Sequence, residues 1–383
     1  MRPPEPVLAA LRGRPRPVCA YVYDTAALRA RAAAVRAALP PGTVLLYAVK
    51  ANGHPAVVGT LARACDGLEV ASGGELTLAV AAGARRIAFG GPAKTDTELA
   101  AAVAAGAQIN VESAHELRRL AHLTSGVDVT IRVNRAAAGP PGTHAMTGAP
   151  TPFGVDEAQL PGVLALAAAL PGIRVTGFHL HAVSNNLDAA AHAAFVTDAV
   201  AWSVAAAARH GVDLRVVNAG GGLGVDHAGD ATLDLAALRT GLSALDLPAG
   251  VELVLEPGRI LAADAGWYAA EVLDLKRAHG RVFAVLRGGT HHFRLPAAWG
   301  YSHPFTVLPV AAWPYPFPRP EVTDADVDAV GELCTPRDVL ARGQPVDRLR
   351  VGDVLVFGRA GAYGWDISHH DFLRHPQPAF LVV

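Results

Sequence analysis

The sequence predicts a (β/α)8 barrel followed by a β domain. Short β-rich runs alternate with alanine-rich segments that carry apolar residues at helical spacing, and this alternation stops at residue 271. Eight such steps in about 220 residues fit a closed barrel better than an open doubly wound sheet. We therefore expect a barrel over residues 25–270 and a β domain over residues 271–383, with residues 1–24 contributing a strand to the β domain.

Each barrel strand is expected where a short apolar run ends in turn-forming residues. The first run, "VLLYAV", is apolar throughout, which is typical of a parallel strand buried on both faces. The segments between the runs, such as "HPAVVGTLARAC", have the spacing of helices that pack on one face. The expected strands cover residues 43–50, 67–72, 86–90, 108–112, 128–134, 174–182, 214–219 and 252–256.

The β domain is expected from a different pattern. After the barrel, the short runs "VFAVLRG" and "DVLVFG" are typical of strands, and the proline-rich "WPYPFPRP" cannot continue a helix or a central strand. Ahead of the barrel, "PVCAYVYD" is the strand that we expect to join this domain.

The composition favours a globular enzyme over a nucleic-acid-binding or membrane protein. The 383 residues carry a net charge of -1, with 51% hydrophobic and 17% charged residues, so no surface for nucleic acid or an acidic membrane is expected. The cysteines Cys19, Cys65 and Cys334 are too few and too scattered for a disulfide framework or a CxxC metal site. No long uncharged apolar run predicts a membrane span, and we expect the protein in the cytoplasm.

Polar residues collect where the predicted barrel strands end. Catalytic groups of such barrels come from these ends, because the βα loops form the active face. Lys50 ends the first strand, although lysine is almost never buried without a partner. A surface lysine with a buried stem is the alternative. The other polar residues at strand ends are Ser72, Glu112, Arg132, His179, His181 and Glu256. This concentration of polar groups leads us to interpret Lys50 as functional.

Glycine motifs follow the last two strands, where barrels often bind phosphate. Gly220–Gly222 would let backbone N–H groups approach an anion, and Arg259 could add a charge-assisted contact. A lysine and a separate phosphate site are typical of pyridoxal 5'-phosphate (PLP) enzymes, in which the lysine amine binds the cofactor aldehyde. Glu256 could then face the pyridine nitrogen. His181 could stack on the ring, or it could be a hydrogen-bonded core histidine.

The order of the motifs resembles that of the fold-type III PLP-dependent decarboxylases, such as diaminopimelate and ornithine decarboxylases. The motifs are "YAVKAN", "LEVASGGEL", "GFHLHAVSNN", "NAGGGLG", "EPGR", "ELCTPRD" and "GAYG". The resemblance implies an alanine-racemase-like fold, removal of an α-carboxylate, PLP as cofactor, and a homodimer in which Cys334 of one subunit enters the partner's active site. The cofactor-binding residues expected on this basis are Lys50, Glu69, Arg132, His181, Ser184, Gly221, Gly222, Glu256, Gly258, Arg259 and Tyr363, and the catalytic residues are Lys50, His181, Glu256 and Cys334.

The β domain departs from this family at the residues that are expected to bind the substrate. The family has an acidic residue after the cysteine, which binds the distal amine of the substrate, whereas this chain has the neutral Thr335. The segment "GGTHHFRLPAAWGYSHPF" looks more like relatives from siderophore and antibiotic pathways, which act on amino acids carried on citrate or on a carrier protein. We expect a citrate-conjugated amino acid, with carrier-bound glutamate or a free diamino acid as alternatives. The expected substrate contacts are Arg294, His292, Thr335 and Arg337; solvated arginines are the alternative.

Other functions remain open at this stage. A racemase could use the same barrel, but racemases of this type place an arginine at the pyridine nitrogen, where this chain has Glu256. A metal-dependent hydrolase could use His179 and His181, which share one face of a strand, but it leaves Lys50 and the glycines unexplained. A non-catalytic PLP-binding protein would lack the second domain. We assign no metal.

Overall fold

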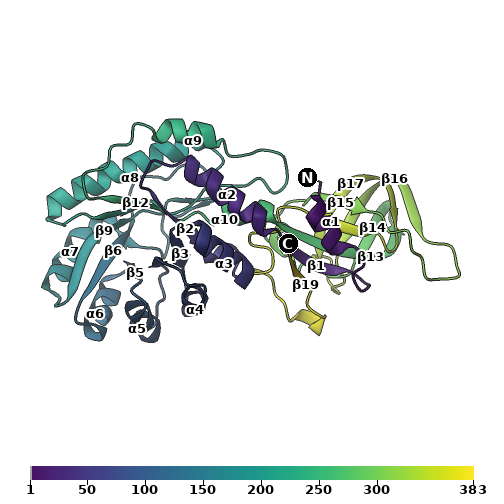
Figure 1. The fold of residues 1–383 in the computed structure, drawn as a ribbon, viewed down its shortest axis with the longest axis horizontal. Coiled ribbons are helices and arrows are strands. Elements are labelled where there is room, and N and C mark those ends of the chain that lie inside the picture. Colours follow the sequence, from purple (N-terminus) through teal and green to yellow (C-terminus); the bar gives the residue numbers. More distant parts are fainter. Residues whose placement is uncertain (1) are drawn as a thin grey trace. The chain divides into compact units, whose positions relative to one another are not determined.

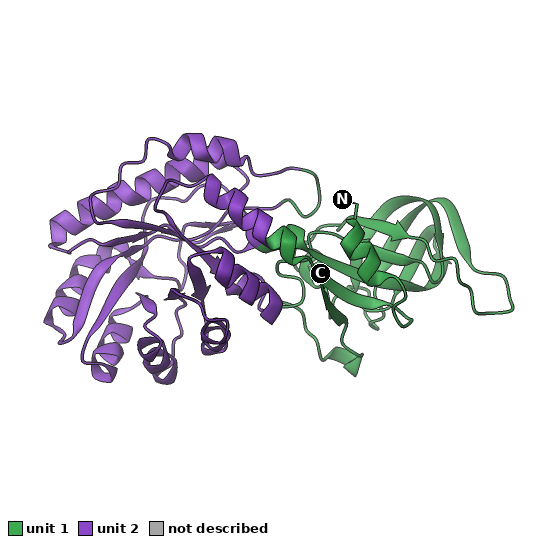
Figure 2. Cartoon of the chain, viewed as in Figure 1, with its two compact units in different colours: residues 1–28, 226–230, 262–383 green, residues 29–225, 231–261 purple. Residues whose placement is uncertain are grey.

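The computed structural model describes residues 2–383, which form two compact units (Figure 2). The β unit contains the chain up to Leu28, Asp226–Asp230 and Ala262–Val383. The barrel unit contains Arg29–Val225 and Ala231–Leu261. The β unit is therefore built from three separate stretches of the sequence.

The barrel unit is a closed sheet of parallel strands (Figure 1), which confirms the predicted fold class. Each barrel strand pairs with the next along the chain, and β12 pairs with β2 through Val254 and Val44, which closes the ring. The short strand β8 (Val155–Asp156) extends the sheet beside β6. The barrel strands are β2 (Val44–Ala48), β3 (Gly67–Val70), β4 (Ile87–Phe89), β5 (Gln108–Val111), β6 (Val127–Asn134), β9 (Ile173–His179), β11 (Val216–Asn218) and β12 (Glu252–Leu255).

Several helices of the barrel unit begin at side chains that cap them. Ser72, Thr95 and Ser113 each accept a hydrogen bond from the backbone N–H three residues later, which satisfies a donor left free in the first turn. These caps fix where the chain turns from loop into helix on the active face of the barrel. The helices are α2 (Thr25–Ala37, across the boundary), α3 (Pro55–Ala64), α4 (Gly73–Ala81), α5 (Asp96–Ala104), α6 (Ala114–Leu123), α7 (Leu160–Ala169), α8 (Ala189–His210) and α9 (Leu235–Leu242).

Helix α8 is the one helix of residues 2–383 that is long and apolar enough to cross a membrane, judged by length and composition alone. About 44% of its most apolar window is buried, and the helix contacts β9 and β11. Its apolar residues therefore pack on the barrel, as those of a helix covering a parallel sheet do.

Strand β9 is shorter than the predicted strand 174–182. It ends at His179, and the backbone then leaves the barrel to pair β10 (Val183–Ser184) with β7 (His144–Ala145) in a separate two-stranded sheet. His181 consequently lies in the loop after the strand instead of inside it. This loop is at the carboxyl end of the barrel, where the βα loops form the active face.

The β unit contains an eight-stranded sheet with the path β15-β18-β13-β14-β16-β17. Strand β1 pairs antiparallel with β13 and parallel with β19. The strands are β1 (Cys19–Tyr23), β13 (Gly266–Ala278), β14 (Arg281–Leu286), β15 (Phe305–Leu308), β16 (Glu321–Val330), β17 (Val339–Arg350), β18 (Val354–Phe357) and β19 (Ala379–Val382), and the helices are α1 (Glu5–Leu11), α10 (Arg259–Ala262, at the boundary) and α11 (Leu295–Trp299).

The core of the β unit joins both ends of the described chain. Val7 and Leu11 of α1 are buried in one cluster with Val22 of β1, Trp267 of β13 and Val356 of β18. Burial of such side chains contributes roughly 1.5–3 kcal/mol each. Helix α1 is therefore held by the sheet that β1 enters.

The segment Asp226–Asp230 belongs to the β unit although barrel residues flank it on both sides. The Arg359 guanidinium donates hydrogen bonds to the backbone carbonyls of Asp226 and Gly229. The ring centroid of His227 lies 6.1 Å from that of Tyr301. These contacts fix a loop that begins only a few residues after the glycine triplet.

Candidate active site

Lys50 stands on a single helical turn directly after the first barrel strand. Strand β2 ends at Ala48, two residues before the predicted end, and Val49–Ala51 form a 3-10 turn closed by the N–H of Asn52 (2.9 Å). The Lys50 side chain is 45% exposed, and its Nζ lies 2.5 Å from Oε2 of the buried Glu69. A carboxylate therefore orients the amine and leaves it accessible to a ligand.

Glu256 is a buried carboxylate directly after the last barrel strand. Its side chain is 4% exposed, Nδ2 of Asn218 donates to it at 2.5 Å, and Nε2 of His179 lies 3.4 Å away. Burial opposes the charged form, but the His179 ring, the Asn218 hydrogen bond and the Lys50 charge together hold the pKa of Glu256 below its usual value. Glu256 is thus a buried negative charge.

Gly220–Gly222 form a cradle after β11 that only glycine can form. Gly220 and Gly222 have φ angles of +68° and +104°, a backbone region that other residues rarely adopt. A Cβ atom on Gly220 would lie 2.5 Å from Nδ1 of His181, and one on Gly221 would lie 2.4 Å from the backbone oxygen of Glu256. The absence of side chains lets backbone pass close to both residues.

His181 presents a neutral imidazole beside this cradle. The backbone N–H of Gly221 donates to its Nδ1 at 3.2 Å, which requires that nitrogen to be unprotonated. Burial, followed by the charges of Arg132 and Lys50, holds the pKa of His181 well below its usual value. The ring is therefore uncharged near neutral pH.

Arg132 is fixed at the end of β6 by Glu112. Nη1 of Arg132 lies 3.0 Å from Oε1 of Glu112, and the guanidinium lies 4.9 Å from the Phe153 ring centroid. The same carboxylate accepts the backbone N–H groups of Gly91 (2.8 Å) and Gly154 (2.9 Å). Glu112 therefore ties two loops of the active face to one arginine.

A second buried ion pair lies next to this network. Nζ of Lys94 is 2.6 Å from Oε1 of Glu116, and the two side chains are 1% and 6% exposed. Oε2 of Glu116 accepts the backbone N–H of Glu112 at 3.0 Å. Burial raises the pKa of Glu116, and the Lys94 charge opposes this rise.

Three further expected cofactor residues are in the same region. Ser184 is in β10. This strand lies close to the glycine cradle, because a Cβ atom on Gly222 would lie 2.7 Å from the backbone oxygen of Val183, the residue before Ser184. Gly258 packs on the Lys50 turn, because a Cβ atom there would lie 2.9 Å from Cβ of Ala51. Arg259 is buried at the start of α10. The structure thus brings the expected barrel residues to one end of the barrel.

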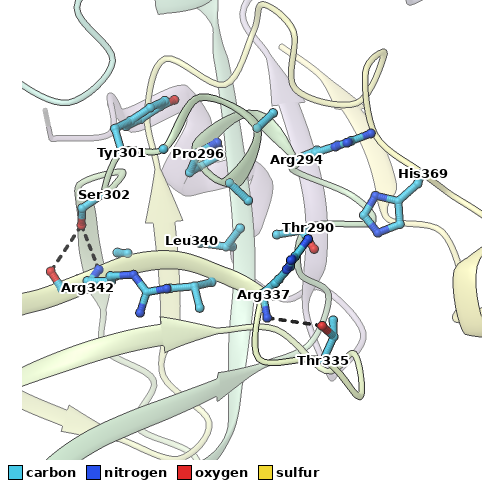
Figure 3. Close-up of a pocket in the computed structure, with 15 residues that line it drawn as sticks. Thr290, Arg294, Pro296, Tyr301, Ser302, Thr335, Arg337, Leu340, Arg342 and His369 are labelled. Atoms are coloured by element: carbon cyan, nitrogen blue, oxygen red, sulfur yellow. Dashed lines mark hydrogen bonds between the residues drawn. The ribbon is translucent and has the colours of Figure 1, made fainter.

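The β unit contains its own cavity, of about 760 Å³ (Figure 3). Its wall includes Arg294, Arg337 and Arg342, with the hydroxyl groups of Ser302 and Thr335. None of the described residues that line the cavity is acidic, and none of these three guanidinium groups forms an ion pair with a carboxylate of residues 2–383. The cavity is therefore suited to an anionic ligand.

The loop that carries Cys334 and Thr335 is folded around Asp338. The buried Asp338 carboxylate accepts the backbone N–H groups of Thr290 (2.6 Å) and Leu333 (2.9 Å). Cys334 itself is exposed. The loop is thus held by an internal carboxylate while Cys334 remains exposed.

His292 differs from the other expected substrate contacts. It is fully buried, does not line the cavity, and places Nδ1 3.4 Å from Sγ of Cys19. Burial, with the neighbouring His291, lowers the pKa of His292 to about 2. His292 is therefore a neutral core residue that does not line this cavity, and its expected contact with substrate stays a prediction.

Tyr363 adopts a left-handed backbone conformation with φ +54°, which is uncommon outside glycine. Its ring centroid lies 5.8 Å from that of Trp299, the last residue of α11. Residues held in this region of φ and ψ cluster at functional sites, which is consistent with the expected role of Tyr363.

Sequence reasoning missed the role of Asn218. Its Nδ2 donates to Glu256, and its Oδ1 accepts the N–H of Gly220 at 2.8 Å, so one side chain joins the acid to the cradle. A polar residue in the last position of an otherwise apolar strand was the available signal. Likewise, metal binding was the one specific role considered for His179, whereas the structure places it against Glu256.

The barrel residues meet the chemical requirements of PLP. An accessible amine can react with an aldehyde, bare backbone can approach a phosphate, and a buried carboxylate can face a protonated ring nitrogen. Lys50, the glycine cradle and Glu256 supply these groups, and the Lys50 charge contributes to the lowered pKa of Glu256.

Comparisons with known proteins agree with this chemistry. The family described as pyridoxal-dependent decarboxylase, pyridoxal binding domain, matches residues 25–263. The 2-[(L-alanin-3-ylcarbamoyl)methyl]-2-hydroxybutanedioate decarboxylase of Staphylococcus aureus is 42% identical, over 100% of this chain and 98% of that protein. Diaminopimelate decarboxylase of Deinococcus radiodurans is 36% identical, over 94% of this chain and 88% of that protein.

Solved structures show the same fold. Diaminopimelate decarboxylase from Helicobacter pylori, complexed with L-lysine, superposes with a TM-score of 0.86 at 24% identity, over 98% of this chain and 94% of that one. The family match covers most of the barrel, and the relatives are similar along nearly their whole length. The chain therefore belongs to the family of pyridoxal-dependent decarboxylases.

Proposed function

We propose that the barrel unit binds PLP, with Lys50 at the aldehyde, Gly221, Gly222 and Arg259 at the phosphate, and Glu256 at the pyridine nitrogen. The observation that carries this proposal is the presence of an accessible lysine amine, a bare backbone cradle and a buried carboxylate at one end of one barrel. When bound, PLP supplies an electron-withdrawing ring that takes up the electron pair left at Cα when CO2 departs.

The protein residues orient the reaction. Glu69 holds Nζ of Lys50, and Glu256 stabilises a proton on any nitrogen that hydrogen-bonds to it. His181 is neutral, so its ring face can stack on an aromatic ligand without adding charge. Arg132, fixed by Glu112, adds a positive charge near these groups.

The proposal includes a homodimer in the cytoplasm with shared active sites. Cys334 is exposed on the β unit, and we assign it to the barrel of the partner subunit. There its thiol donates a proton to Cα after the bond to the carboxylate breaks, and solvent reprotonates the thiolate. Tyr363 of the β unit is assigned to the cofactor phosphate, and no nucleic acid or membrane takes part.

The proposed substrate is an α-amino acid joined to a citrate-like hydroxy acid. The name of the Staphylococcus aureus relative describes an amino-acid end linked through an amide to a hydroxybutanedioate with two carboxylates. In this chain, the neutral Thr335 cannot pair with a cationic amine, and Arg294 and Arg337 line a cavity without acidic residues. Arginine suits carboxylate recognition, so these two residues are assigned to the anionic end of the substrate.

Carbon dioxide release from a panel of substrates tests this function. The panel contains a citrate-linked amino acid, a carrier-bound glutamate, and free diaminopimelate, lysine and ornithine. We expect the highest kcat/KM for the citrate-linked compound. A higher kcat/KM for a free diamino acid contradicts the substrate assignment, and no CO2 from any member contradicts the activity.

The variant Arg294→Ala tests directly whether Arg294 binds the anionic end of the substrate. Loss of a charge-assisted hydrogen bond costs roughly 1.5–3 kcal/mol, so KM for the citrate-linked substrate should rise about 10- to 150-fold. Arg277→Ala is the matched control, because Arg277 is exposed on β13 of the same unit and does not line the cavity. An unchanged KM in Arg294→Ala contradicts the assignment.

A further inference from the structure

The positive charge on the wall of the β-unit cavity is not balanced by the protein. Several other arginines of this unit pair with acids, as Arg319 does with Asp353 at 3.1 Å. By contrast, Arg294, Arg337 and Arg342 have no carboxylate partner among residues 2–383. Three like charges around one cavity repel one another, so a ligand with several negative charges would be bound more strongly than one with a single charge.

Nearby ionisable side chains offset this charge only in part, because one carboxylate, Asp338, acts on His369 of the cavity wall. The Asp338 carboxylate is buried and already accepts two backbone N–H groups. The pKa of His369, on the cavity wall, is lowered by burial and by the Arg294 charge, so this ring is neutral near pH 7. The arginines therefore set the charge of the cavity.

The arginines stand at different points of the wall (Figure 3). In this view Arg294 lies on the side of His369, whereas Arg342 lies beside Ser302. The Arg342 end is well anchored: its backbone N–H donates to Oγ of Ser302 (2.8 Å), and that hydroxyl donates to the backbone carbonyl of Arg342 (3.3 Å). Separated cationic groups fit carboxylates on different carbons of one molecule, and adjacent hydroxyl groups can bond an alcohol.

The cavity is complete within the β unit. Every residue that lines it lies between Thr290 and His369, and none comes from the barrel unit. Recognition of an anionic group there requires neither Lys50 nor the glycine cradle. The amino-acid half of a substrate and the cofactor are thus unnecessary for this part of the binding.

From these observations we infer that the cavity binds free hydroxy-polycarboxylic acids, such as citrate, on its own. Such acids then compete with the citrate-linked substrate, which makes the enzyme sensitive to the concentration of the unconjugated acid. The competition rests on the proposed function, whereas the binding rests on the cavity alone. Arg342, which the sequence did not single out, becomes a specificity-determining residue.

Calorimetric titration of the full-length holoenzyme with citrate tests the binding without any turnover. We expect saturable binding of citrate at millimolar concentrations or below, and much weaker binding of acetate, lysine and inorganic phosphate. Arg342→Ala should weaken citrate binding about tenfold or more, the effect of one charge-assisted hydrogen bond, while Arg277→Ala should leave it unchanged. Lys50→Ala should bind citrate like the wild type.

The outcomes separate this inference from the proposed function. Absence of citrate binding, equal binding of acetate or phosphate, or an unaffected Arg342→Ala variant overturns the inference, whatever the enzyme decarboxylates. Loss of citrate binding in Lys50→Ala also overturns it, because the site would then depend on the barrel. If the enzyme binds citrate but does not act on citrate-linked amino acids, the inference is supported and the substrate assignment is contradicted.

Discussion

Replacing Glu256 with glutamine removes one buried charge and leaves the shape of the site nearly unchanged. The carboxylate is 4% exposed, accepts a hydrogen bond of 2.5 Å from Asn218 and lies 3.4 Å from His179. The glutamine carbonyl can still accept from Asn218, so we expect the barrel to fold. The variant lacks the negative charge that would favour a protonated nitrogen on a ligand.

The magnitude follows from the burial of this carboxylate. Removing one preorganised electrostatic group from a water-excluded site costs about 2.7–4 kcal/mol in transition-state stabilisation, and each 1.36 kcal/mol is a factor of about ten. Glu256→Gln should therefore lower kcat about 10²- to 10³-fold. The cofactor content, measured by visible absorbance, should change little, because Lys50 and the glycine cradle remain.

The assay is the initial rate of CO2 release at saturating substrate, with Glu157→Gln as a matched control. Glu157 is also a hydrogen-bonded carboxylate, with Trp202 (2.7 Å) and the backbone N–H of Ala136 (2.8 Å) as donors, but it is not one of the candidate site residues. The control should retain wild-type kcat. An unchanged kcat in Glu256→Gln would refute the assigned role, and a loss of cofactor would show that the residue acts in binding instead.

Three further predictions use other residues. Lys50→Ala should lose the visible absorbance of bound cofactor and almost all turnover; a variant with near-normal turnover contradicts its role. Mixing Lys50→Ala with Cys334→Ala subunits should restore about a quarter of the activity, because random exchange gives half heterodimers with one competent site of two; no recovery despite proven exchange argues against shared sites. Lys94→Met should destabilise the fold by roughly 3–5 kcal/mol in urea unfolding, because it leaves the buried Glu116 unpaired, and the double variant with Glu116→Met should recover much of this loss; an additive double variant contradicts the pairing.

The barrel could be predicted because its signal is local. Each strand is an apolar run followed by a turn, and Lys50 and Glu256 stand out because a charged residue directly follows such a run. The role of Asn218 could not be predicted, because it depends on a contact with Glu256, 38 positions later in the chain. The predicted strands also extended past the observed strand ends. The first one continued beyond Ala48, where hydrogen bonds within the loop form a turn.

The anion cavity was only partly visible in the sequence. Arg294 and Arg337 were expected to contact substrate because they flank the predicted site, where the neutral Thr335 replaces the family's acid. Arg342 lies in a strand, β17, and has no motif around it. Similarly, the attachment of Asp226–Asp230 to the β unit depends on Arg359, more than a hundred positions away. Contacts between residues so far apart produce no pattern in a single sequence from which they could be predicted.

The pairing of β1 with β13 has a consequence for how the protein is made. Tyr21 and Val22 of β1 are translated about 245 residues before their partners Tyr268 and Trp267. At about 5–20 residues per second, the nascent chain carries an uncovered apolar strand for some tens of seconds, while the barrel residues between them emerge and can begin to fold. Translational pauses inside the barrel should therefore increase aggregation or chaperone binding at β1, whereas pauses between β13 and β19 should have a smaller effect, because they leave only the β19 edge of β1 unpaired.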